Sequence, residues 1–130
     1  MTRILLALIA TTAAMPAAPC TIGYHDLIEQ NRDGLGRLKI GMTREEVVVL
    51  MGDCGIRIRA TTYSNPYRTA VLKKGEDSYE VLYYLIQRHQ KFTSIRDTNA
   101  VPIVLKDGRV VGWGDSAIRD IRDTAEKSPD

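Results

Sequence analysis

The stretch GMTREEVVVLMG, residues 41–52, carries the strongest local structural signal in the chain. Thr43 followed three positions later by Glu46 is a capping box, in which the two side chains bond backbone amides at the start of a helix. Gly52 supplies a residue that accepts a positive φ after the last helical turn. The stretch therefore predicts a helix from Arg44 to Met51.

Strand patterns follow this helix. GIRIRATTY, residues 55–63, alternates apolar and polar side chains and predicts a strand with one buried face and one exposed, cationic face. SYEVLYYLIQ, residues 78–87, is rich in aromatic and branched side chains, as expected of a central strand with contacts on both faces. Residues 63–77 are expected to form a long connection and residues 88–100 an exposed loop.

The C-terminal part of the chain is expected to form a hairpin followed by a tail, and the N-terminal part a short helix. Apolar residues 101–105 and 110–113 flank Asp107-Gly108, a pair suited to a type I′ turn. Residues 117–130 read as a polar tail or a frayed helix. Residues 22–32 place apolar side chains at helical spacing, so a short first helix is expected, followed by a glycine-rich connector.

The order of these elements predicts an α+β fold over residues 20–116. Two short N-terminal helices are expected to pack on a three- to four-stranded antiparallel sheet, with a short C-terminal helix as an optional addition. A chain of 130 residues has room for one such domain with a modest core. Its formal charge of +2 gives no strong basic field, so nucleic acid is not an expected partner.

Residues 1–19 have the layout of a secretory signal peptide. Arg3 precedes an apolar run from Ile4 to Ala10, and small residues follow. The run is too short to span a bilayer, which takes about 20 residues. Cleavage after Ala14 or after Ala18 are both open, and either places the mature protein in the cell envelope or outside the cell.

Export gives the two cysteines a role. Cys20 and Cys54 are the only thiols, and an oxidising compartment favours their pairing, so a disulfide is expected if Cys20 is not acylated. Lipidation of Cys20 ranks second, since Ala17 and Pro19 occupy positions where a lipoprotein box usually has Leu and a small residue. The predicted location is therefore the periplasm, or the outer membrane if Cys20 carries a lipid.

The helix in residues 41–52, the hairpin LKDGRVVGWG in residues 105–114 and the exported N-terminus together resemble the SmpA/OmlA (BamE-like) envelope domain. The resemblance is closer to an uncharacterised relative whose sheet ends in a Lys-Asp-Gly hairpin followed by Gly-Trp-Gly. It spans about residues 38–116. The motif residues of this chain are Gly41, Met42, Thr43, Glu46, Gly52, Asp107, Gly108, Gly112, Trp113 and Gly114.

What the resemblance implies is a small module of the Gram-negative envelope that binds other envelope proteins or lipid. Its namesake is an accessory lipoprotein of the outer-membrane β-barrel assembly machine. Such domains usually have Gly-x-Pro after the helix, whereas Cys54 stands at the third position here. We therefore expect a non-catalytic binding or scaffolding protein that serves outer-membrane protein assembly or envelope integrity. A periplasmic inhibitor or ligand-binding module is the alternative.

Several side chains are candidates for a partner surface, although each also fits a solvated strand face or loop. They are Arg57, Arg59, Arg88, His89, Lys91 and Phe92.

A small thiol-dependent enzyme is the rival from another class, with Cys54 as nucleophile and His25 or His89 as base. The helix that ends at Met51 points its negative end toward Cys54, which opposes a thiolate there. The three residues are also too scattered for a metal site. No catalytic residue, cofactor or metal is therefore expected.

Overall fold

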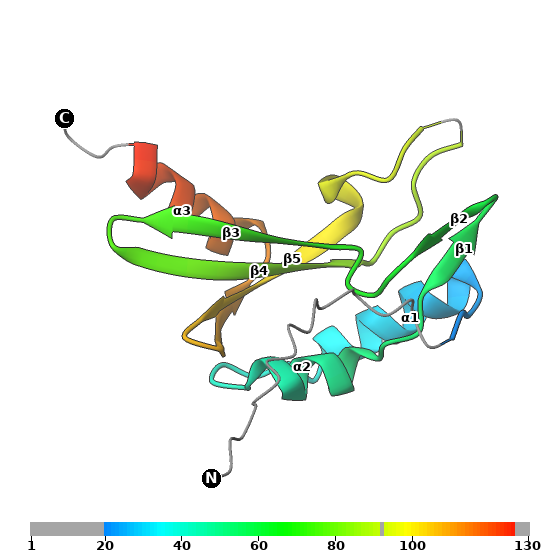
Figure 1. The fold of residues 1–130 in the computed structure, drawn as a ribbon, viewed down its shortest axis with the longest axis horizontal. Helices are drawn as coiled ribbons and strands as arrows, with labels where there is room; N and C mark the ends of the chain where they lie inside the picture. Colours follow the sequence, from blue (N-terminus) through cyan, green and yellow to red (C-terminus); the bar gives the residue numbers. More distant parts are fainter. Residues whose placement is uncertain (1–19, 92, 127–130) are drawn as a thin grey trace, which may run out of the picture.

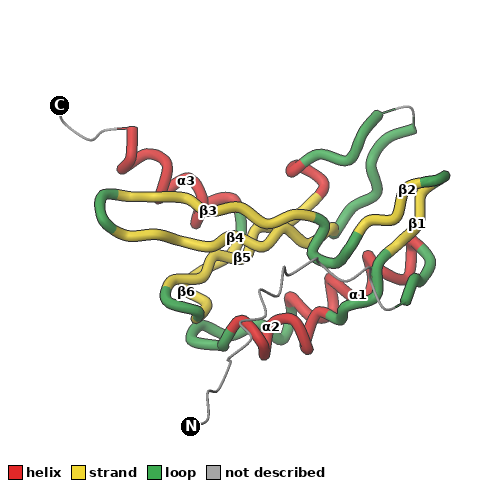
Figure 2. The backbone as a smooth tube through the Cα atoms, in the orientation of Figure 1, coloured by secondary structure: helices red, strands yellow, loops and turns green. Residues whose placement is uncertain are grey.

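Residues 20–91 and 93–126, which the computed structural model of the protein describes, form three α-helices, one short 3-10 helix and two antiparallel sheets (Figure 1, Figure 2). The prediction of an α+β fold is confirmed. Phe92, the expected signal peptide and residues 127–130 lie outside the described part. The elements are α1 (Tyr24–Leu35), α2 (Arg44–Met51), β1 (Ile56–Ile58), β2 (Thr61–Tyr63), β3 (Arg68–Lys74), β4 (Asp77–Leu85), η1 (Asp97–Asn99), β5 (Ala100–Lys106), β6 (Arg109–Trp113) and α3 (Asp115–Glu126).

Helix α2 has the predicted bounds and the predicted cap. The Glu46 amide donates to Thr43 Oγ1 over 3.1 Å, and the Thr43 amide donates to Glu46 Oε1 over 3.2 Å. Gly52 ends the helix at φ 84°, and a Cβ at this position would collide with the side chain of Gln30. The backbone angle therefore favours glycine here, whereas the flexible Gln30 side chain could move away from a Cβ.

Helix α1 continues past the predicted end at residue 32 and includes Gly34, which was predicted to lie in a connector. The reason is a close helix crossing. A Cβ on Gly34 would lie 2.6 Å from Sδ of Met51, so the absent side chain lets α1 approach α2. Packing therefore outweighs the low helix propensity of glycine.

The four-stranded sheet has the order β3-β4-β5-β6, with the predicted central strand β4 inside it. Alternate residues of β4 enter two cores: Val81 and Tyr83 face one cluster, and Leu82 and Tyr84 face the other. The hydroxyl of Tyr84 is buried and has no hydrogen-bond partner in the described part of the chain, and burial raises the pKa of this phenol. Strand β4 thus has contacts on both faces, as predicted.

Helices cover both faces of this sheet, which only partly matches the prediction. Helix α2 packs on one face through Val47 and Met51. Helix α3 packs on the other face through Ile118 and Ile121 (Figure 1). The C-terminal helix is therefore part of the core. None of the described helices is long and apolar enough to cross a membrane.

Two local predictions were wrong. Residues 55–63 are not one strand but the hairpin β1-β2, which turns near Arg59, a residue with φ 57°. The connection predicted over residues 63–77 contains β3, which pairs along its whole length with β4. The predicted hairpin at Asp107-Gly108 is confirmed, since both residues have positive φ as a type I′ turn requires.

The two edges of the four-stranded sheet differ. Residues 41–44 run beside β6: the Gly41 amide donates to the Val110 carbonyl and the Val110 amide to the Met42 carbonyl, each over 2.8 Å. The segment leading into α2 therefore covers that edge. No strand of the described residues pairs with the outer edge of β3, where Val71 is 64% exposed.

A buried amide network ties the helices to the sheet. Asn31 and Asn65 bond each other reciprocally, each Nδ2 donating to the other's Oδ1 over 3.0 and 2.9 Å. Asn31 Nδ2 also donates to the Leu85 carbonyl over 2.8 Å. Asn65 Nδ2 donates to the carbonyls of Met51 and Gly52 over 3.2 and 3.0 Å. The end of α2, the loop before β3, α1 and β4 therefore share one polar centre.

Candidate functional site

Cys20 and Cys54 form a disulfide, with their Cα atoms 4.7 Å apart. The expected pairing is confirmed. The amide of Gly55 also donates to the Cys20 carbonyl over 2.9 Å, so the N-terminal segment is held beside the start of β1. Asp53 lies next to the two sulfurs, but a disulfide offers no thiolate to a metal or a substrate. The oxidised chain therefore has no nucleophile at Cys54.

Five of the predicted surface residues gather at one end of the molecule, which we call the basic end. Arg57 and Arg59 lie on the β1-β2 hairpin, while Arg88, His89 and Lys91 lie on the loop between β4 and η1. Figure 1 shows the hairpin and the loop side by side. Phe92, the sixth candidate, is outside the described residues.

Helix α1 fixes the loop through Tyr24. The Tyr24 hydroxyl lies 2.9 Å from His89 Nδ1 and accepts a hydrogen bond from the His89 amide over 3.2 Å. The two rings stack with centroids 5.7 Å apart, and the Arg88 guanidinium lies 4.9 Å from the Tyr24 ring centroid. The loop is thereby held against the end of α1.

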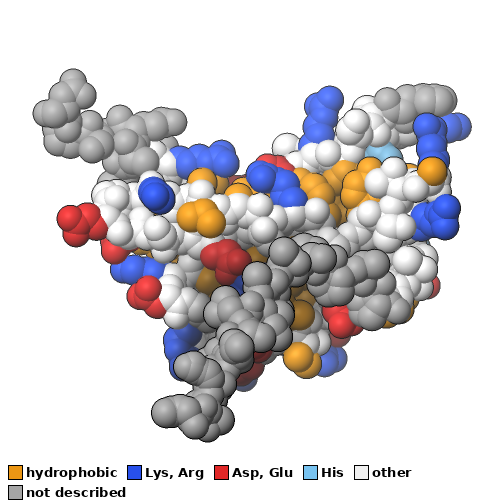
Figure 3. Space-filling view, in the orientation of Figure 1, with side chains coloured by type: hydrophobic (Ala, Val, Ile, Leu, Met, Phe, Trp, Pro, Cys, Tyr) orange, Lys and Arg blue, Asp and Glu red, His pale blue; other side chains and the backbone are white. Residues whose placement is uncertain are grey.

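A groove of about 410 Å³ runs between the hairpin and the loop, and we call it the hairpin groove. Its wall has an apolar part and a polar rim that includes Arg59 and His89. Figure 3 shows Lys and Arg side chains around hydrophobic ones at this end, on the right of the view. A groove of mixed polar and apolar side chains beside exposed arginines is compatible with a protein-binding surface. The lining residues are Ile58, Arg59, Thr61, Tyr63, His89, Thr93, Ser94 and Ile95.

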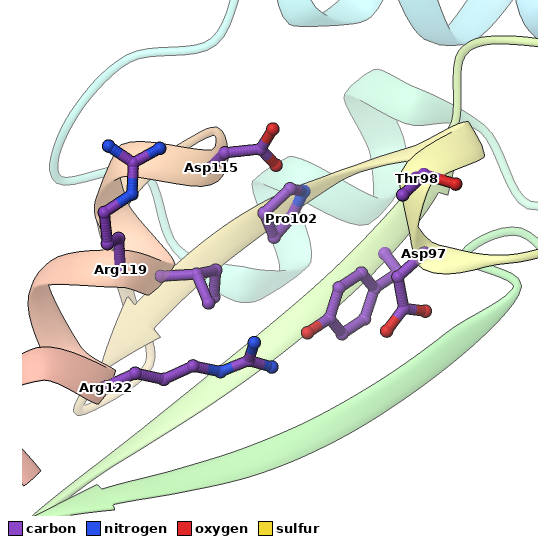
Figure 4. Close-up of a pocket in the computed structure, with 8 residues that line it drawn as sticks. Asp97, Thr98, Pro102, Asp115, Arg119 and Arg122 are labelled. Carbon is purple, nitrogen blue, oxygen red and sulfur yellow. The ribbon is translucent and has the colours of Figure 1, made fainter. Parts of the chain in front are cut away.

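A second cavity of about 440 Å³, here called the α3 cavity, lies between α3, η1 and the sheet (Figure 4). No residue of it was predicted as a site residue. Its members come from four separate elements, so no local pattern marks them. They are Tyr83, Asp97, Thr98, Pro102, Asp115, Ile118, Arg119 and Arg122.

One wall of the α3 cavity is built around Asp97. Its Oδ1 accepts hydrogen bonds from the Tyr67 hydroxyl and from Arg68 Nε, the latter over 2.8 Å, and its Oδ2 accepts one from Arg68 Nη2 over 2.6 Å. The Arg68 guanidinium also lies 4.3 Å from the centroid of the Tyr83 ring. This arrangement fixes the carboxylate and the ring together.

The same contacts shift the pKa values of two groups in this wall, the Asp97 carboxyl and the Tyr67 phenol. Hydrogen bonding to Arg68 lowers the pKa of the Asp97 carboxyl. Burial, followed by the hydrogen bond to Asp97, raises the pKa of the Tyr67 phenol to about 12. Because protonation of Asp97 removes its bonds to Arg68, the network is stable only while the carboxylate is ionised.

Asp97→Asn is expected to lower the free energy of unfolding by about 1 kcal/mol at pH 7, a small value because the Arg68 and Asp97 side chains are 41% and 43% exposed. The folded-state pKa of Asp97 lies below the unfolded value. Its contribution is therefore full above the unfolded pKa of about 3.9 and is lost as the pH falls through the folded pKa. Urea unfolding of both proteins at pH 7 and pH 2.5 measures this. A difference that persists unchanged at pH 2.5 would contradict it.

Comparison with known proteins gives one match. The sequence model of the family described as "Protein of unknown function (DUF3192)" matches residues 16–120, which includes both cysteines, the hairpin groove and most of the α3 cavity. No curated protein and no solved structure matches the chain.

Proposed function

The chain belongs to the DUF3192 family, and from this premise we propose that it is an exported, non-catalytic binding protein of the cell envelope. Its basic end contacts an acidic surface of a partner protein. The resemblance to the SmpA/OmlA (BamE-like) domain supports a role as an accessory of outer-membrane protein assembly or envelope integrity. A sulfur of Cys20 that is bound to Cys54 cannot carry a lipid, which supports the periplasmic, unlipidated alternative for the oxidised chain.

The observation that carries this proposal is the convergence of two cationic segments on the hairpin groove. Arg59 and His89 lie 30 positions apart in the chain and both line it. The arginines and the lysine of these two segments are exposed, and exposed positive charge steers an acidic partner toward the groove. The half-buried side chains of Ile58, Tyr63 and Ile95 then offer the partner some apolar surface to cover. The disulfide agrees with export, since such bonds persist mainly in oxidising compartments.

The experiment is crosslinking of the tagged chain in envelope fractions, followed by identification of captured proteins. We expect the native chain to capture an envelope protein, and Arg57→Glu/Arg59→Glu to reduce its recovery by about tenfold. Arg37→Glu/Lys39→Glu is the matched control. It makes the same charge change on exposed residues after α1, away from the basic end, and should recover the partner normally.

Two results would contradict the proposal. Equal loss of the partner in both double variants would show that only net charge matters. Failure of the native chain to capture any envelope protein would count against a binding role. If the captured protein is an enzyme and its activity falls on addition of the chain, the protein is an inhibitor, which is the alternative function.

A further inference from the structure

We propose that the α3 cavity binds a short apolar peptide with free termini, with the peptide carboxylate at Arg122 and the peptide ammonium at Asp115. This ligand class is independent of the protein partner at the basic end. The proposal rests on the size of the cavity, on its apolar floor and on the placement of opposite charges at its two ends.

The size and the floor fit a small organic ligand. Pockets of about 300–1,000 Å³ with apolar walls and few polar groups are typical of such sites, and this cavity holds about 440 Å³. Three buried side chains supply apolar surface: Tyr83, Pro102 and Ile118. Tyr83 and Ile118 are 3% and 7% exposed. An apolar ligand side chain that packs on them would be removed from water, which favours binding.

The charges at the two ends are opposite and lie on the same face of α3. Asp115 and Arg122 are seven positions apart, which is about two turns and ~10 Å along a helix. Ile118 lies between them. Figure 4 shows the Asp115 carboxylate and the Arg122 guanidinium reaching across the cavity from α3, the latter toward Asp97. An extended tripeptide also spans about 10 Å, so it is long enough to bridge side chains that start two helical turns apart.

Asp97 does not take the place of the ligand carboxylate. Both of its oxygens already accept hydrogen bonds from Tyr67 or Arg68, so its attraction to Arg122 is purely electrostatic and leaves the Arg122 donors for a ligand carboxylate. The Arg122 guanidinium is a planar donor suited to a carboxylate. Arg119 is on the same helix, but its guanidinium points away from Asp97 in Figure 4. Arg119 therefore provides a matched control for the loss of one positive charge.

Calorimetric titration of the purified, oxidised full chain tests the proposal with three probes. They are the tripeptide Leu-Ala-Leu with free termini, its N-acetylated form and its C-terminal amide. We expect the free peptide to bind about tenfold more tightly than either blocked form, because each block removes one charge-assisted contact. Arg122→Gln should abolish the preference over the amide, and Asp115→Asn the preference over the acetylated form. Arg119→Gln should change affinity less than about twofold.

Other outcomes overturn the proposal. The first is that no probe binds at millimolar concentration. The second is that the blocked peptides bind as tightly as the free one. The third is that Arg119→Gln and Arg122→Gln lose equal affinity for the free peptide. Binding that tolerates acetylation but not amidation would indicate a simple anion site and would also overturn it. If a variant fails to fold by thermal unfolding, the comparison of the three peptides on the native chain still decides. None of these results depends on capture of a protein at the basic end.

Discussion

Asn65→Ala is expected to lower the free energy of unfolding by about 3 kcal/mol, a large part of the ~5–15 kcal/mol available to a domain of this size. The side chain is 5% exposed. Its removal leaves the Asn31 amide without its reciprocal partner and the Gly52 carbonyl without the amide that bonds it. Buried polar groups left unpaired cost about 1–3 kcal/mol each. Chemical denaturation with urea measures the change.

A double-mutant cycle separates this network from simple loss of packing. Asn31→Ala removes the other half of the amide pair, so Asn31→Ala/Asn65→Ala should cost clearly less than the sum of the two single changes. Ser64→Ala is the control in the same loop, because Ser64 is exposed and its side chain donates to the nearby Pro66 carbonyl on the surface. Its effect should stay below about 1 kcal/mol. Strict additivity of the two asparagine changes would contradict the coupled network.

Cys20→Ser/Cys54→Ser is expected to lower the free energy of unfolding by about 3–4 kcal/mol. The bond closes a loop with a sequence separation of 34 residues. Closing a loop of that length restricts the unfolded chain by about this amount. Without the bond, the N-terminal segment is held by backbone contacts of Cys20 and Ile22 with Gly55 and by packing of Ile22 on the core. Urea unfolding of the oxidised native chain and of the variant gives the difference.

Reduction provides the matching control. Dithiothreitol should shift the unfolding midpoint of the native chain toward that of Cys20→Ser/Cys54→Ser and leave the variant unchanged. A native chain whose midpoint is the same with and without reductant would contradict a stabilising disulfide. Equal mass of the oxidised and reduced chains would show that the bond does not form.

Local sequence patterns were enough to predict an element where a few adjacent residues determine its backbone conformation. The Thr43-Glu46 capping box and the Asp107-Gly108 turn were predicted at the right positions, because each signal lies within four residues. Strand β4 was predicted from its run of aromatic and branched side chains with little polar interruption, which reflects burial on both faces.

The elements that were missed depend on partners distant in sequence. Strand β3 is an edge strand with exposed Val71 and two terminal lysines, so its polarity resembles that of a loop. Gly34 stays helical because of a contact with Met51 on another helix. The turn near Arg59 uses a positive φ at a residue type that gives no such signal. Tertiary contacts decide all three.

The candidate sites also contain features that the local sequence predicts and features that depend on tertiary contacts. The basic residues of the hairpin and of the loop were identified from their charge, but their convergence on one groove depends on the fold. The α3 cavity was not foreseen, since Asp97, Pro102 and Arg122 meet only when α3 packs across the sheet. The amide pair of Asn31 and Asn65 gave no signal either, because both residue types are usual in loops and at helix ends.

The unpaired edge of β3 affects whether the protein self-associates at high concentration. An open strand edge is a template on which identical chains stack. If two copies met antiparallel along all seven residues, Arg68 of each would lie opposite Lys74 of the other. Like charges directly across a strand pair are unfavourable. Because Arg68 is already paired with Asp97, this repulsion opposes self-association only in part, and it weakens further as salt screens it.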